Sequence, residues 1–192
     1  MPAAVVARLI VWLWFAAAVV GTQLGVLQRG PALVVPAIIF GLTAALLSAY
    51  FFLRPARAWI DALDLRSLVL LHVTRFIGFA FLLLHRRGEL PAAFAIPAGF
   101  GDIIVAAFVL PVVFAPLDDR QRERAIVIWN MVGLVDILLV VATAARLNLA
   151  DPAQLRPLAR LPLSLLPTFL VPLIIASHVI IFARVARLAR ER

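Results

Sequence analysis

Six long apolar runs constrain the fold of this chain more than any other feature. Of its 192 residues, 65% are hydrophobic, against roughly 45–50% in a soluble domain. An apolar helix of about 20 residues is long enough to cross the ~30 Å hydrocarbon core of a bilayer. We therefore predict an all-α, polytopic membrane helical bundle of six transmembrane helices, with residues 1–192 forming a single membrane domain. The expected spans are residues 9–27, 32–53, 67–84, 93–115, 125–145 and 163–183.

The distribution of arginine predicts the orientation of the bundle. All 18 basic residues are Arg, and an abundance of Ala, Leu, Arg and Pro without Lys is typical of a GC-rich bacterial genome. If both termini are cytoplasmic, the inner segments hold the larger share of Arg, as the positive-inside rule requires. The inner residues are Arg8, Arg54, Arg57, Arg66, Arg120, Arg122, Arg124, Arg184, Arg187, Arg190 and Arg192, and the outer ones are Arg29, Arg86, Arg87, Arg146, Arg156 and Arg160. The aromatic residues Trp12, Trp14, Tyr50, Trp59 and Trp129 then lie near the inner interface. We expect a multi-pass protein of the bacterial inner membrane.

Composition excludes several functions. The formal net charge of +8 comes from Arg residues at helix ends, so we expect lipid headgroups as partners and no nucleic acid. The absence of cysteine removes disulfides, thiolate metal sites and cysteine nucleophiles. No metalloprotease, P-loop, dinucleotide-binding or nucleophile-elbow motif is present. These observations favour a protein other than an enzyme, and they are compatible with a homo-oligomer.

Three charged residues, Arg75, Asp102 and Asp136, lie in the middle of predicted spans. Each costs about 2.5–3.5 kcal/mol at the centre of a bilayer, so each indicates a function or a buried partner. Gly99 and Gly133 precede the two aspartates by three residues, and small residues let a neighbouring helix or a ligand approach closely. The sequence therefore predicts that the three charges converge in one site, with a carboxylate in salt-bridge contact with the arginine.

The charges in this site do not balance. A structural ion pair of Arg75 with one aspartate leaves a second carboxylate, which must be protonated, bind a cation, or pair with a charged histidine or substrate. This residual charge favours the binding or transport of a small solute, coupled to a proton or cation. Arg75 would hold a carboxylate or an anionic group of the solute. We expect Asp136 to pair with Arg75 and Asp102 to exchange the proton, because Pro97 and Gly101 could open the helix backbone beside Asp102.

A second polar layer is predicted nearer the inner edge. At 1.5 Å rise per residue, His72, Asn130 and His178 fall at about the same depth. Asn130 is included in the predicted binding site. The two histidines could ligate haem b or a metal, because a b-type haem takes one imidazole from each side. The first hypothesis requires no cofactor, whereas the alternatives are a haem-binding or electron-transfer subunit and a structural or assembly protein in which the charges only join helices.

Local signals predict smaller features. Residues 54–66 mix Trp and Ile with Arg and Asp, which suits a short helix in the inner interface. Asp151 and Pro152 form a typical helix start. The pair Gly21-x-x-x-Gly25 indicates close packing of the first span. Kinks are expected at the prolines of the fourth and sixth spans, which are Pro97, Pro111, Pro167 and Pro172.

Several short motifs resemble a known family. They are Arg75-x-x-Gly78, Pro97-Ala98-Gly99-x-Gly101-Asp102, Trp129-Asn130-x-x-Gly133-Leu134-x-Asp136 and Pro167-x-Phe169-x-Val171-Pro172, followed by His178. Over residues 68–185 the chain resembles an uncharacterised family of small bacterial multi-pass membrane proteins. The resemblance implies the six-helix fold and supplies no activity and no catalytic residue.

Overall fold

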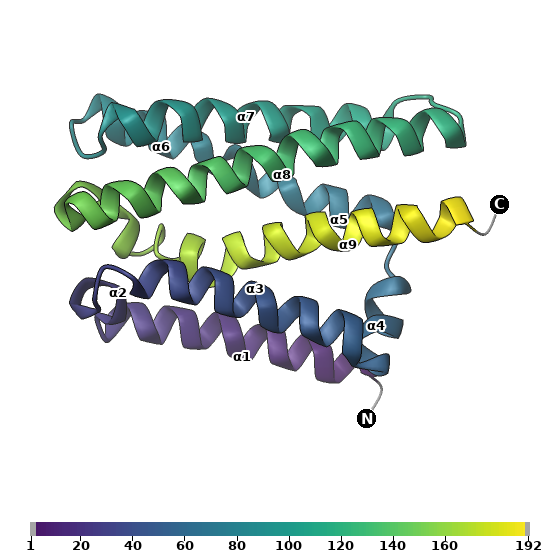
Figure 1. Ribbon diagram of the computed structural model, residues 1–192, viewed down its shortest axis with the longest axis horizontal. Coiled ribbons are helices and arrows are strands. Elements are labelled where there is room, and N and C mark those ends of the chain that lie inside the picture. Colours follow the sequence, from purple (N-terminus) through teal and green to yellow (C-terminus); the bar gives the residue numbers. More distant parts are fainter. Residues whose placement is uncertain (1–2, 191–192) are drawn as a thin grey trace. The chain divides into compact units, whose positions relative to one another are not determined.

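The computed structural model describes residues 3–190, and every regular element within them is helical (Figure 1). Six helical segments are long and apolar enough to cross a membrane, which confirms the predicted all-α, multi-pass class. They are Val5–Gln23, Val34–Phe52, Leu65–Arg86, Ala92–Phe114, Asp119–Ala150 and Leu166–Leu188. Each overlaps one predicted span. Arg192, which was counted in the charge bias, lies outside the described residues, and the orientation of the termini stays a prediction.

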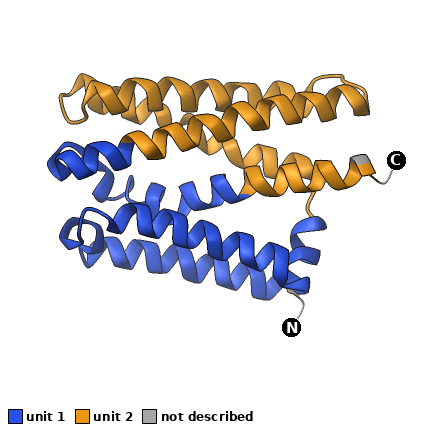
Figure 2. Ribbon diagram, viewed as in Figure 1, with its two compact units in different colours: residues 1–62, 144–176 blue, residues 63–143, 177–192 orange. Residues whose placement is uncertain are grey.

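The chain divides into two compact units (Figure 2). Residues 1–62 and 144–176 form the first unit, and residues 63–143 and 177–192 form the second. Helices α8 (Asp119–Ala150) and α9 (Val171–Arg190) each contribute to both. The single membrane domain expected from the sequence stays a prediction.

In the first unit, the helices α1 (Ala3–Gln23) and α3 (Val34–Phe52) both contact α4 (Arg54–Asp61) and the π-helical turn η3 (Leu166–Leu170). The first span ends earlier than predicted. Gly25 has a φ of 74°, in the left-handed region that favours glycine, and the short helix α2 (Val26–Arg29) follows it. Gly25 therefore closes a helix, and the expected role of Gly21 and Gly25 as a helix-packing pair is wrong.

Two short helices of the first unit confirm local predictions. Helix α4 occupies the segment that was expected to lie in the inner interface, and the Tyr50 hydroxyl donates to Asp61 Oδ1 at 3.0 Å. The 3₁₀ helix η2 (Pro152–Ala159) begins at the predicted Asp-Pro signal. Its N-cap, Asp151, accepts a hydrogen bond from the Ala153 amide at 2.9 Å.

The prolines of the sixth span produce an irregular turn, as predicted. Pro172 has no N–H, so it cannot donate to the carbonyl of Thr168 four residues earlier. The backbone there forms the π-helical turn η3, and the Trp14 indole N–H donates to that Thr168 carbonyl at 2.9 Å. A side chain of α1 thus satisfies a carbonyl that the proline leaves free.

In the second unit, the third span combines three elements: α5 (Leu65–Leu70), the 3₁₀ helix η1 (Leu71–Ile77) and α6 (Gly78–Arg86). All three contact α7 (Ala92–Phe114). Helix α7 is unbroken through Pro97, so the expected opening of its backbone near Asp102 is wrong. The apolar core of the unit consists of Val69, Val105, Val109, Val112, Val113, Ile126, Trp129, Ile181 and Val185.

Arg122, near the start of α8, satisfies the C-terminus of α7. Its guanidinium donates to the carbonyl oxygens of Val112, Val113, Ala115 and Leu117, at distances between 2.7 and 3.3 Å. The last carbonyls of a helix have no intrahelical partner and carry partial negative charge. Arg122 supplies both the donors and the positive charge, which fixes the turn between α7 and α8.

Candidate functional site

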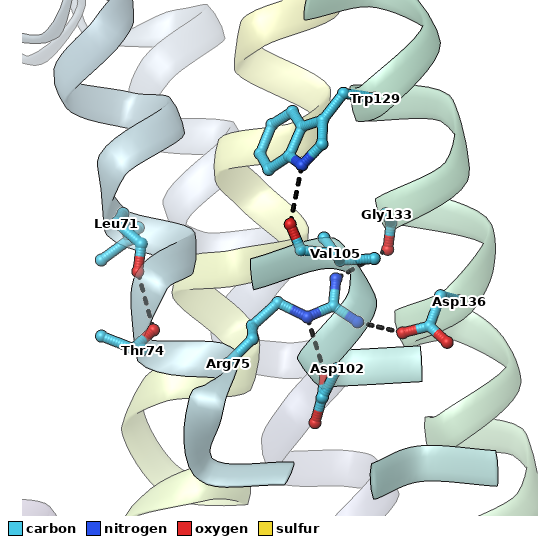
Figure 3. Close-up of polar contacts among 8 residues, drawn as sticks. All are labelled: Leu71, Thr74, Arg75, Asp102, Val105, Trp129, Gly133 and Asp136. Carbon is cyan, nitrogen blue, oxygen red and sulfur yellow. Dashed lines mark hydrogen bonds and ion pairs between the residues drawn. The ribbon is translucent and has the colours of Figure 1, made fainter. Parts of the chain in front are cut away.

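The guanidinium of Arg75 joins three helical elements of the second unit (Figure 3). Its Nε donates to Asp102 Oδ1 at 2.6 Å, its Nη1 donates to the Gly133 carbonyl at 3.0 Å, and its Nη2 donates to Asp136 Oδ2. All three guanidinium nitrogens are therefore engaged, and the residue is only 1% exposed. This confirms the predicted convergence of Arg75, Asp102 and Asp136.

The local backbone explains how one arginine reaches both aspartates. Arg75 lies in η1, where the 3₁₀ geometry places residues three apart on the same side of the helix. His72 and Arg75 therefore share one face. Asp102 lies on α7 and Asp136 lies on α8, so the ion pairs connect η1 with each of these helices.

Glycines allow these elements to approach closely. A Cβ built on Gly78 would collide with the backbone carbonyl oxygen of Gly99 and would lie 3.0 Å from the Asp102 Cβ. One built on Gly101 would collide with the Asp136 carboxylate. A Cβ on Gly133 would lie 2.6 Å from His178 Cε1. Gly133 thus has the role that the sequence predicts for it, and Gly101, which was expected to open the backbone, has the same role: both leave room for a neighbouring helix and its polar side chains.

The two aspartates differ in exposure. The side chain of Asp102 is 5% exposed, whereas that of Asp136 is 20% exposed. The expected division, with Asp136 as the ion-pair partner and Asp102 as the exchanging group, is not seen. Arg75 pairs with both carboxylates, and Asp136 is the more exposed of the two. The physical reason is that α7 stays helical around Asp102, so its carboxylate remains enclosed.

Replacing Gly101 by alanine is expected to disrupt the site. The new methyl group would displace the Asp136 carboxylate from Arg75, and overpacking of this kind costs about 1–3 kcal/mol. Thermal unfolding of the purified variant measures the loss. Gly41→Ala is the matched control, because a Cβ on Gly41 of α3 meets nothing within 4 Å and alanine favours a helix. Equal melting temperatures for the two variants would contradict the packing described.

The residues of the predicted inner layer also meet. The Asn130 amide donates from Nδ2 to the His178 carbonyl at 3.0 Å, and its Oδ1 lies 2.7 Å from His178 Nδ1. His72 Nε2 lies 3.0 Å from the hydroxyl of Ser177. His72, Asn130 and His178 are completely buried. Sequence reasoning missed Ser177, although a hydroxyl next to a histidine in an apolar run was a usable signal.

The two imidazoles do not fit a haem between them. Their ring centroids are 4.2 Å apart, with an angle of 50° between the ring planes. Two metal–imidazole bonds of about 2.0–2.1 Å would place the ligating nitrogens alone roughly 4 Å apart, with the ring centroids further back. The rings lie too close for an iron on this axis. Among residues 3–190, no group of three or more potential metal-ligating side chains is present either.

The fold and the site together define a class: a multi-pass helical membrane protein with a buried cluster of one arginine and two aspartates. A family model described as a domain of unknown function, DUF8737, matches residues 32–186, and the chain belongs to this family. This confirms the resemblance to an uncharacterised family and extends it to the second span. No curated protein and no solved structure matches the chain.

Proposed function

We propose that the protein binds a small solute and transports it across the membrane, coupled to a proton or cation that binds at the Arg75–Asp102–Asp136 cluster. The observation that supports this most is the combination of unequal charge and unequal exposure in the cluster. One guanidinium faces two carboxylates, and the side chain of Asp136 is 20% exposed in the middle of α8.

The charge imbalance requires compensation. If both aspartates are ionised, the cluster holds a net charge of −1 in a medium of low dielectric constant, where an uncompensated charge is costly. Because the two carboxyl groups interact, they bind a proton as a pair. One bound proton, or one bound cation, removes the excess charge. Asp136 is the better position for this exchange, because its carboxylate is the more accessible one.

The geometry also narrows the role of Arg75. Its three nitrogens already donate to Asp102, Gly133 and Asp136, so an anionic solute would have to displace a carboxylate to reach it. Arg75 therefore holds the carboxylates, and the exchanging ligand is positively charged. The solute itself would bind on the accessible side of Asp136.

Ion flux into proteoliposomes tests the proposal. We expect vesicles that contain a trapped pH dye, or a sodium dye, to show flux through the wild-type protein under an imposed membrane potential. Asp136→Asn should abolish the flux, because an amide neither exchanges a proton nor carries the charge that holds a cation. Glu89→Gln, in the exposed connection between α6 and α7, is the matched control and should retain it. Absence of both fluxes in the wild type, or full flux in Asp136→Asn, would refute the proposal.

A structural function is the second candidate, and one observation favours it. Arg75 is completely enclosed and its guanidinium has three acceptors, which is what a group that only joins helices requires. A structural function predicts that Asp136→Asn changes the stability of the protein and that there is no ion flux for the substitution to abolish. The proteoliposome experiment therefore separates the two candidates.

The proposed location is the bacterial inner membrane, with both termini in the cytoplasm. A fluorescent protein fused after the last residue should be active in the cytoplasm. Alkaline phosphatase inserted after Asp151, between α8 and η2, should be active on the outer side. The basis is the excess of Arg in the inner segments. Reporters active on the same side of the membrane would contradict this topology.

A further inference from the structure

Asp136 lies at the edge of an exposed, apolar stretch of α8. Its neighbours on the same side of the helix, four residues before it and three residues after it, are Val132 and Leu139. Both are more than half exposed, and the side chain of Asp136 between them is 20% exposed. Along α8, the exposed edge of the carboxylate is therefore bordered by hydrocarbon side chains.

Helix α7 borders the same carboxylate with further apolar residues. Gly101 of α7 lies against Asp136. About one turn later in α7, Val105 lies against Gly133, which precedes Asp136 by three residues in α8. The two helices therefore run antiparallel and in contact at this level. Ile104, three residues after Gly101, is more than half exposed and lies about one turn from the carboxylate.

One oxygen of the Asp136 carboxylate is left for a ligand. Oδ2 accepts the hydrogen bond from Arg75 Nη2, whereas Oδ1 is the atom that a Cβ on Gly101 would meet first (Figure 3). No donor within residues 3–190 forms a hydrogen bond to Oδ1. Because position 101 has no side chain, the carboxylate fits between the two helices with its edge at their apolar surface.

These surroundings select the kind of solute that Asp136 can hold. A metal cation as solute would need several oxygen ligands, and the side chains that border the carboxylate are hydrocarbon. An organic cation with apolar groups around its charge meets both requirements. Its charge pairs with the carboxylate, and its apolar groups contact Ile104, Val132 and Leu139. Such a cation also enters a bilayer without a shell of water, because its charge is covered by hydrocarbon.

Charged and titratable groups surround Asp136 on its buried side. Arg75 on η1 pairs with it, and Asp102 on α7 shares that arginine. The imidazoles of His72 on η1 and His178 on α9 are completely buried and lie in contact with each other. Asp136 is more exposed than any of these four residues, so a ligand from the membrane reaches it first.

We propose that the transported solute is a monovalent organic cation with apolar groups around its charge, and that it binds Asp136 from the apolar surface of α7 and α8 in place of the proton. This inference rests on the proposed function. Arg75, Asp102 and Asp136 sum to −1 when all are ionised, and either ligand makes the sum zero. Both ligands together would leave an excess of +1 in a medium of low dielectric constant, which is costly. Binding of the cation therefore releases the proton to water, and each ligand weakens the binding of the other by the same factor.

Binding of radiolabelled tetraphenylphosphonium to the detergent-purified protein tests the inference. We expect saturable binding to the wild type. Once Asp136 binds a proton, the dissociation constant should rise about tenfold for each unit by which the pH is lowered. Asp136→Asn should lose the saturable binding and show only partition into detergent. Tetramethylammonium has the same charge and far less apolar surface, so it should compete more weakly, by roughly tenfold or more.

A pair of leucine variants tests the apolar border. Leu139→Ala should weaken the binding of tetraphenylphosphonium several-fold, because it removes apolar contact beside the carboxylate. Leu110→Ala is the matched control and should bind as the wild type does. Leu110 is another exposed leucine, and it lies nine residues after Gly101 on α7. Equal binding by the two leucine variants would contradict the proposed position of the solute.

Four further results would overturn the inference. They are no saturable binding to the wild type, equal binding to wild type and Asp136→Asn, binding that does not depend on pH, and tetramethylammonium that competes as well as tetraphenylphosphonium. Each of them leaves the proposed function standing if Asp136→Asn still abolishes ion flux in proteoliposomes. Unchanged flux in that variant is the result that refutes the proposed function itself.

Discussion

Replacing Arg75 by methionine is expected to lower the free energy of unfolding by about 3–5 kcal/mol, the usual cost of breaking a buried ion pair by removing one partner. The variant leaves Asp102 and Asp136 facing each other without a cation. Denaturation of the detergent-purified protein, followed by its helical circular dichroism, measures the change. Arg57→Met is the matched control, because Arg57 is 44% exposed and its pair with Asp61 spans 3.7 Å. An exposed pair contributes roughly 0–1 kcal/mol.

Removing the two remaining carboxylates as well should restore most of the free energy of unfolding that Arg75→Met loses. In the triple variant Arg75→Met, Asp102→Asn, Asp136→Asn, no unpaired charge is left in the second unit's centre. Neutral replacements of buried ionic groups are often tolerated without loss of stability. A triple variant as unstable as Arg75→Met alone would show that volume and shape, not charge, explain the loss.

The second large effect is expected at Asp102. Asp102→Asn should lower the free energy of unfolding by about 1.5–3 kcal/mol, the value of a hydrogen bond to a charged group. Its carboxylate accepts from Arg75 Nε at 2.6 Å and is only 5% exposed. Asp136→Asn should lower the free energy of unfolding by a smaller amount. The side chain of Asp136 is 20% exposed, and an amide resembles the neutral acid that we propose there. Melting curves of the two variants decide the matter, and an equal or larger loss at Asp136 would reverse the assignment.

Much of the fold follows from the sequence for simple reasons. Hydropathy and length determine that six segments are long and apolar enough to cross a bilayer, because a helix rises a fixed distance per residue. The high cost of a mid-span charge forces Arg75 to find a carboxylate. The regular rise also explains why His72, Asn130 and His178 meet in one layer. Each of these three predictions needs only the geometry of a single helix or a single energetic cost, and none needs the packing of helices against one another.

The remaining features depend on how helices are rotated against one another, which periodicity does not determine. The 3₁₀ turn η1 directs both His72 and Arg75 toward the interior, and nothing in the local sequence predicts it. The pairing of Arg75 with both aspartates requires the approach of α7 and α8 that Gly101 permits. The left-handed Gly25 was predicted as a packing residue, because a Gly-x-x-x-Gly pattern does not show where a helix ends.

Infrared spectroscopy of the carboxyl groups tests the central claim, that the cluster exchanges a proton or a cation at Asp136. Lipid-reconstituted protein is held on an attenuated-total-reflection surface while the pH or the sodium concentration is changed. We predict a carboxylic-acid C=O stretch at low pH in the difference spectrum of wild type minus Asp136→Asn, and it should disappear when the pH is raised or sodium is added. A difference spectrum that lacks this band at every pH and is unchanged by sodium would contradict the account and assign the cluster to structure alone.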